Sequence, residues 1–129
     1  MNFISTRIIT NDVDQLVKFY EKITGIKALQ YTVDFVEFQY KNANLAIGSV
    51  RTLQFFGGEE VAKASQNRTA IIEFIVEDVE AVYNNLAITL QNFLVQKPTL
   101  MPWGNKSLLF RDPDGNLVNF FTPVTPDAI

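Results

Sequence analysis

The chain has 129 residues, of which 47% are hydrophobic, and its 14 acidic and 11 basic side chains give a net charge of −3. This length predicts one compact domain, and this hydrophobic fraction predicts a substantial core rather than a disordered chain. The absence of a basic patch argues against nucleic-acid binding, and no stretch reaches the roughly 20 apolar residues of a membrane span. Because the N-terminus also lacks the layout of a signal peptide, we expect a cytoplasmic protein.

Two residue types that carry much of enzyme chemistry, cysteine and histidine, are absent. Without cysteine there are no disulfides, thiol nucleophiles or thiolate metal sites. Without histidine the chain lacks the commonest transition-metal ligand and the side chain best suited to proton transfer near neutral pH. Ser-His-Asp and Cys-His catalysis are therefore excluded, and acid–base chemistry falls to carboxylates, lysines or tyrosines with shifted pKa values.

The first half of the chain predicts a strand, a helix and three more strands. From Val13 onward apolar residues recur with the i, i+3, i+4, i+7 spacing of a helix that buries one face. Asn11 or Asp12 is suited to cap the start of this helix, and Gly25 is placed to end it. A hairpin turn is expected at residues 41–44. The predicted strands are 3–9, 27–31, 35–40 and 45–49.

The same pattern recurs in the second half, 66 residues later. Asp78-Val79 there corresponds to Asp12-Val13 in the first half. The predicted strands here are 70–76, 93–97, 106–110 and 117–122, with a hairpin turn at 112–115. Each half therefore predicts a βαβββ module, and two such modules can bury apolar area that one alone leaves exposed. The expected organisation is a single domain over 1–129, with modules at about 1–49 and 69–123, a linker at 50–68 and a tail at 124–129.

Three motifs carry a resemblance to a known family. They are Asp12 followed by Phe19-Tyr20, the loop Pro102-Trp103-Gly104, and the run FRDPDGN at 110–116. Together with the tandem modules they resemble the vicinal oxygen chelate superfamily, which includes glyoxalase I, bleomycin resistance proteins, fosfomycin resistance enzymes and extradiol dioxygenases. The resemblance implies an α+β fold in which tandem βαβββ modules form an open, U-shaped mixed sheet around a ligand cleft. It also implies a homodimer, since many members are dimers.

The resemblance further indicates where metal ligands stand in metal-dependent relatives. Seven residues before each helix-start aspartate this chain has Ser5 and Ile71, and four residues after the hairpin glycine it has Asn119. The fourth position falls within 46–48, where no residue is a ligand type. Because none of these is an imidazole or a carboxylate, we expect the family's metal site to be lost and predict no metal or cofactor.

Arg7 and Glu73 are charged residues that share strand faces with two of these positions. Residues two apart on a strand point to the same face, so Arg7 accompanies Ser5 and Glu73 accompanies Ile71. Each also lies five residues before its module's helix-start aspartate, which makes the two equivalent in the repeat. One interpretation is an ion pair between them that stabilises the fold. The other is that one or both orient a polar ligand, with Glu73 as a candidate catalytic base of raised pKa.

Further ligand contacts are expected from the last strand and from two loops. Asn119, which shares a face with Phe121, could recognise a neutral polar group or could make a structural hydrogen bond to neighbouring backbone. Trp103 could stack on a planar ligand or plug the edge of the core. Phe55 and Phe56 could form a flap or a dimer contact. The candidate ligand-binding residues are Ser5, Arg7, Glu73, Trp103, Asn119 and Phe121.

These observations favour a metal-free protein of the bleomycin-resistance-like branch that binds a small molecule, for example to sequester an antibiotic or a metabolite. One alternative is a lyase, isomerase or hydrolase in which Glu73 is the general base and Arg7 or Asn119 stabilises an oxyanion. A further alternative is a metal-dependent glyoxalase- or dioxygenase-type enzyme with non-standard ligands. The last is a structural domain in which side chains fill the ligand cleft.

Overall fold

The computed structural model describes residues 1–125, so part of the predicted tail, 126–129, lies outside the described residues. The chain divides into two compact units between Gln66 and Asn67. Residues 50–66 of the predicted linker thus belong to the first unit. No helix among the described residues is long and apolar enough to cross a membrane.

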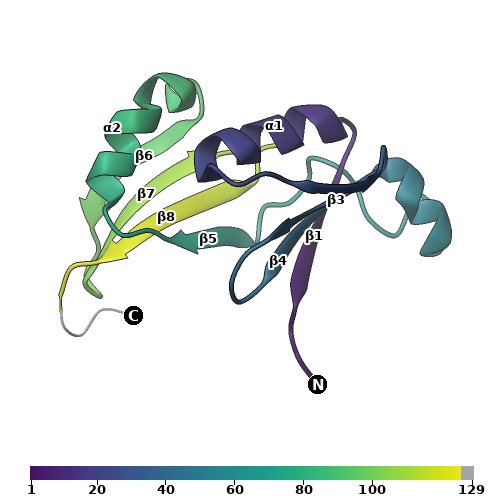
Figure 1. Cartoon of the computed structure of the whole chain (residues 1–129), viewed down its shortest axis with the longest axis horizontal. Coiled ribbons are helices and arrows are strands. Elements are labelled where there is room, and N and C mark those ends of the chain that lie inside the picture. The colour runs from purple at the N-terminus through teal and green to yellow at the C-terminus, as the bar shows by residue number, and fades with distance from the viewer. Residues whose placement is uncertain (126–129) are drawn as a thin grey trace. The chain divides into compact units, whose positions relative to one another are not determined.

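The first unit is a four-stranded mixed sheet with one α-helix (Figure 1). Its strands are ordered β1-β4-β3-β2, with β1 and β4 parallel and the other neighbours antiparallel. A 3-10 helix, which the sequence did not predict, follows the last strand. The elements are β1 Ser5–Thr10, α1 Val13–Thr24, β2 Leu29–Thr32, β3 Phe35–Gln39, β4 Asn44–Ser49 and η1 Val50–Phe55.

The predicted start and end of α1 are confirmed by its caps. The Asp12 carboxylate accepts a hydrogen bond from the backbone N–H of Gln15 at 3.0 Å, which satisfies one of the unpaired donors of the first turn. Gly25 has a φ of 71°, and its N–H donates to the carbonyl of Glu21 at 2.9 Å. A residue with a Cβ adopts this left-handed conformation only with strain, so glycine is suited to end the helix here.

The second unit has the same order of elements and strands, β5-β8-β7-β6. Asp78 caps its helix by accepting a hydrogen bond from the N–H of Ala81 at 3.2 Å. Strands β5 and β8 are parallel, and the other neighbours are antiparallel. These two mixed sheets with their helices confirm the predicted α+β class. The elements are β5 Ile71–Ile75, α2 Val79–Leu90, β6 Leu94–Leu100, β7 Asn105–Arg111 and β8 Leu117–Pro123.

The hairpin turn between β7 and β8 is organised by one buried carboxylate. Asp112 is only 2% exposed, and it accepts hydrogen bonds from the N–H of Asp114, the N–H of Asn116 and the Asn116 side-chain amide at 2.8–3.0 Å. Gly115 has a φ of 84° and donates its N–H to the carbonyl of Asp112. The run at 110–116 therefore holds a turn together, as aspartate and glycine do at such positions.

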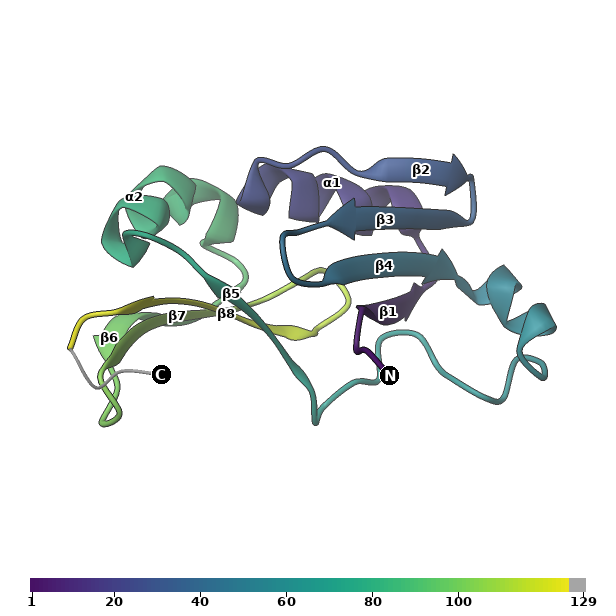
Figure 2. The same cartoon turned by 60° about the horizontal axis from the view of Figure 1, so that its bottom comes forward.

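Each sheet has one face covered by its own helix and one open face, because strand side chains alternate. In the first unit α1 packs on β3 and β4, and Figure 2 views this sheet with α1 behind it. The ring of Tyr20 on α1 meets that of Phe38 on β3 at 6.2 Å between centroids. The residues of opposite parity form the first open face: Ser5, Arg7, Ile9, Phe35, Glu37, Ala46 and Gly48.

In the second unit α2 packs on β6, β7 and β8. Val118 and Phe120 of β8 are buried on this covered side, and Lys106 of β7 reaches Glu80 of α2 at 2.7 Å. The residues of opposite parity form the second open face: Ile71, Glu73, Ile75, Leu109, Leu117, Asn119 and Phe121.

Candidate ligand-binding surfaces

The second open face has a polar pair at its centre. Glu73 on β5 and Asn119 on β8 are register partners in the parallel pairing, and the Asn119 Nδ2 donates to Glu73 Oε2 at 2.9 Å. This bond determines which way the amide points, since a flipped amide would place two acceptors together. The Oδ1 of Asn119 is buried and has no hydrogen-bond partner among the described residues. The pair therefore retains an unused acceptor.

The surroundings of this pair are apolar. Ile71 and Ile75, which flank Glu73 on β5, are 51% and 68% exposed. Leu117 and Phe121 flank Asn119 on β8 and are half-buried. Glu73 itself is exposed, so its carboxylate is open to an approaching donor. The sequence named both Asn119 and Glu73 as candidates but did not predict the hydrogen bond between them. The register of two strands that are distant in sequence cannot be deduced from the sequence of either strand.

The first open face is centred on Arg7. Its guanidinium lies over the rings of Phe35 and Phe56, 4.5 Å and 5.0 Å from their centroids. To reach Phe35 on β3 it crosses β4 at Gly48, where an added Cβ would lie 3.4 Å from the Arg7 Cδ. We call Arg7, Phe35 and Phe56 the arginine clamp. The sequence analysis missed Phe35 and Gly48, although a glycine in a buried strand signals a close approach of another group.

A second charged group lies beside the arginine clamp. Glu37 is on β3 in the same row as Arg7, with Ala46 of β4 between them. Its Oε1 accepts hydrogen bonds from the Tyr31 hydroxyl at 3.2 Å and from the Gln39 amide at 3.3 Å. Desolvation and the negative charge of Glu37 both raise the pKa of Tyr31. The first open face thus carries separate positive and negative positions.

The other predicted contacts have distinct positions. Ser5 is half-buried on β1, and Trp103 is 57% exposed in the loop between β6 and β7. That loop is tightened by a hydrogen bond from the N–H of Gly104 to the carbonyl of Met101 at 2.9 Å. Phe55 is 78% exposed at the end of η1, whereas its neighbour Phe56 contacts Arg7. An ion pair between Arg7 and Glu73, which belong to different units, stays a prediction.

Comparison with known proteins decides the family. The model of the Glyoxalase/Bleomycin resistance protein/Dioxygenase superfamily matches residues 2–120. The chain belongs to this superfamily.

Individual proteins resemble the chain over nearly its whole length. An uncharacterized protein of Bacillus subtilis (strain 168), YraH, is 26% identical over 129 residues, which cover 94% of this chain and 98% of YraH. A glyoxalase/bleomycin resistance protein/dioxygenase from Nocardioides has a TM-score of 0.79 at 18% identity, over 98% of this chain and 85% of that one. A family enzyme from Burkholderia phytofirmans PsJN has a TM-score of 0.84 at 13% identity, over 96% and 100%. At these identities the structural likenesses show the fold alone.

The residues at the metal positions of the superfamily do not fit a divalent ion. Ser5 offers a neutral hydroxyl, Ile71 offers no donor, and Asn119 offers only a neutral amide oxygen. Within residues 1–125 there is no group of three or more carboxylate, histidine or cysteine side chains that could hold a metal ion. Neutral oxygens beside a single carboxylate are a weak donor set for zinc, iron or manganese.

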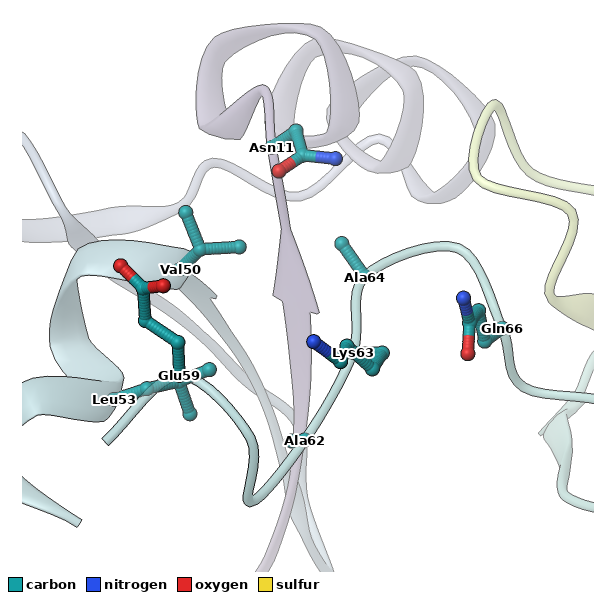
Figure 3. Close-up of a pocket in the computed structure, with 8 residues that line it drawn as sticks. All are labelled: Asn11, Val50, Leu53, Glu59, Ala62, Lys63, Ala64 and Gln66. Carbon is teal, nitrogen blue, oxygen red and sulfur yellow. The ribbon is translucent and has the colours of Figure 1, made fainter. Parts of the chain in front are cut away.

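The first unit also contains a cavity of about 320 Å³ between η1 and the segment that follows it (Figure 3). This is a volume typical of small-ligand sites. None of the predicted ligand-binding residues lines it, because no ligand-binding residue was predicted within 50–68. Lys63, at its wall, forms an ion pair with Glu60 at 3.0 Å. The lining residues are Asn11, Val50, Leu53, Glu59, Ala62, Lys63, Ala64 and Gln66.

Proposed function

We propose that this member of the superfamily binds a small organic molecule without a metal, and that binding itself, such as sequestration of an antibiotic or a metabolite, is its role. The observation that supports this most is the Glu73–Asn119 pair, whose Glu73 carboxylate is exposed among exposed apolar side chains. A few placed polar groups in an apolar surface are typical of small-molecule sites. The residues proposed from the sequence to contact the ligand are Ser5 and Arg7 of the first unit and Glu73, Trp103, Asn119 and Phe121 of the second.

Recognition is favoured over catalysis by the setting of Glu73. A general base that works by burial needs a carboxylate withdrawn from water and free to take a proton from the substrate. Glu73 is exposed and accepts the Asn119 amide, so its geometry suits the anchoring of a ligand's donor group. We also propose that the protein is a homodimer, as the resemblance to the superfamily implies, and that it is cytoplasmic, as expected from its sequence.

Metal analysis of the purified protein tests the metal-independent part of this proposal. We expect substoichiometric zinc, nickel, manganese and iron, and no rise in melting temperature when any of these salts is added, because a folded-state ligand would raise it. Stoichiometric metal, or a clear stabilisation by one of the salts, would contradict the proposal.

A matched pair of variants tests the site. Glu73→Gln keeps the shape of the side chain and an acceptor for Asn119 but removes the charge, so we expect it to lose ligand that co-purifies with the wild type. Glu77→Gln removes the same charge from an exposed position between β5 and α2 and should retain the ligand. Equal retention by both variants would show that Glu73 is not an anchor.

A further inference from the structure

The arginine clamp holds a cation whose hydrogen-bond donors are unused. Within the first unit, residues 1–66, the Arg7 side chain donates no hydrogen bond and joins no ion pair, and its guanidinium lies over the two rings. Arg51 of the same unit is different, since its Nε donates to Asp34 at 2.7 Å. Arg7 therefore presents a guanidinium whose position is set by aromatic rings and not by a carboxylate.

Ring contacts and oxyanion contacts use different parts of a guanidinium. A cation–π contact is an attraction of the positive charge to the face of the ring, whereas hydrogen bonds to an oxyanion use the N–H donors in the plane of the guanidinium. An arginine held over rings can thus still bind a carboxylate or phosphate through two parallel hydrogen bonds. Because the rings restrict the side chain in advance, less conformational entropy is lost when the anion binds.

No carboxylate of the first unit forms an ion pair with Arg7. Glu37 lies in the same row two strands away, but its Oε1 is bonded by Tyr31 and Gln39. The Arg7 guanidinium lies over the Phe35 ring, two residues from Glu37 on β3, and no ion pair joins it to Glu37 in the first unit. The bonds to Glu37 also hold it on its own strand, so the edge of Arg7 stays open to an anion from outside.

The surroundings indicate what carries the anion. Phe56 is 57% exposed and lies beside the guanidinium, and Ile9 flanks Arg7 on β1. An apolar or aromatic body can pack on these side chains while its anionic group reaches Arg7. We propose that the arginine clamp recognises the oxyanion, foremost a carboxylate, of a ligand with an aromatic or aliphatic body. This inference rests on the proposed function, the binding of a small organic molecule.

Binding of four simple probes to the full chain tests this inference. The probes are phenylacetate, its neutral counterpart phenylacetamide, phenyl phosphate and inorganic phosphate. We expect the two aryl oxyanions to shift the Nε–Hε resonance of Arg7 in two-dimensional NMR at millimolar concentration. Phenylacetamide should bind at least about tenfold more weakly than phenylacetate, because it lacks the charge-assisted hydrogen bonds. Inorganic phosphate should be weaker than phenyl phosphate, because it lacks the apolar body.

Variants separate the clamp from a general attraction of anions. Arg7→Gln should weaken phenylacetate binding at least about tenfold, and Arg7→Lys, which keeps the charge without the planar fork, should not restore it. Phe56→Leu removes one ring from an exposed position and should weaken binding without loss of stability. The control is Lys18→Gln, which removes the same charge from the exposed side of α1 and should bind like the wild type.

Three outcomes would overturn the inference. They are equal binding of phenylacetate and phenylacetamide, equal losses in Arg7→Gln and Lys18→Gln, and no shift of the Arg7 resonance by either aryl oxyanion. In the first two cases a small molecule still binds, so the proposed function would survive. Stoichiometric metal in the purified protein would instead remove the proposed function, whatever the probes show.

Discussion

At the scale of single residues, Asn119 is a position where function and stability are expected to conflict. Its Oδ1 is buried without a partner, and an unsatisfied buried acceptor costs about 1–3 kcal/mol. We predict that Asn119→Leu, which removes this acceptor, raises the free energy of unfolding by about 1 kcal/mol in urea denaturation and abolishes ligand retention. Such a gain in stability is common where a polar residue is kept for binding.

Asn116 supplies the contrast for this prediction. It lies on the same hairpin, but its amide is bonded on both sides, donating to Asp112 at 2.8 Å and accepting from Asn67 at 3.2 Å. Asn116→Leu should therefore lower the free energy of unfolding by about 1–3 kcal/mol, because the buried Asp112 carboxylate loses the hydrogen bond that the Asn116 amide donates. If both variants were destabilised to the same extent, Asn119 would be a structural residue.

Gly48 shows how one missing side chain shapes a surface. An added Cβ would lie 3.1 Å from the Thr52 hydroxyl and 3.4 Å from Arg7, and the Thr52 hydroxyl is held by its bond to the carbonyl of Ser49 at 2.7 Å. We predict that Gly48→Ala destabilises the protein by about 1 kcal/mol through overpacking and moves Arg7 off Phe35. In a Thr52→Ala background the same change should cost less, and a double-mutant cycle that shows no coupling would contradict this explanation.

At the scale of elements, η1 is attached to the sheet through Asp34. This carboxylate accepts hydrogen bonds from the Ser49 hydroxyl at 2.8 Å and the Arg51 Nε at 2.7 Å. The hydrogen bond from Arg51, then that from Ser49, lowers the pKa of Asp34 below its usual value. A carboxyl with a lowered folded-state pKa adds stability above its unfolded pKa, and this contribution is lost as the pH falls through the folded value.

The resulting prediction concerns Asp34→Asn and pH. The variant should melt below the wild type at neutral pH, and the two melting temperatures should converge as acid protonates Asp34 in the wild type. Melting curves over a pH series check this. If the difference between the two melting temperatures persists unchanged into strong acid, the charge of Asp34 does not stabilise the contact between η1 and the sheet.

Most elements could be predicted from the sequence because each leaves a local signal. The α1 helix shows its apolar spacing, its Asp12 cap and its terminal Gly25, and the hairpin at Asp112 shows its turn residues. The 3-10 helix η1 was missed because six residues with one buried side chain, Leu53, have no periodic stripe. The candidate site was predicted only in part, since contacts such as Arg7 with Phe35 depend on the register of strands distant in sequence.

At the scale of the whole molecule, the family and the function were predictable to different degrees. The tandem order of elements and the motifs at 102–104 and 110–116 indicate the superfamily, and the match over residues 2–120 confirms it. The residues of the motif at 110–116 form a turn, however, and they do not indicate which reaction, if any, the protein catalyses. Function within this superfamily depends on a few side chains on the open faces, so the shared fold does not specify it.

The proposed homodimer is predicted to appear in native mass spectrometry of the full chain. A dimer should persist in the Arg7→Gln and Glu73→Gln variants, because these substitutions alter single exposed side chains on the open faces. A wild type that is monomeric at micromolar concentration would contradict this part of the proposal.

Native mass spectrometry of protein purified from its own host is also the most direct test of metal-free ligand binding. We predict that the wild type carries an additional mass of an organic molecule, that no metal accompanies it, and that Glu73→Gln loses this mass whereas Glu77→Gln retains it. A bound mass that corresponds to a divalent metal, or an organic ligand retained equally by Glu73→Gln, would contradict the proposal.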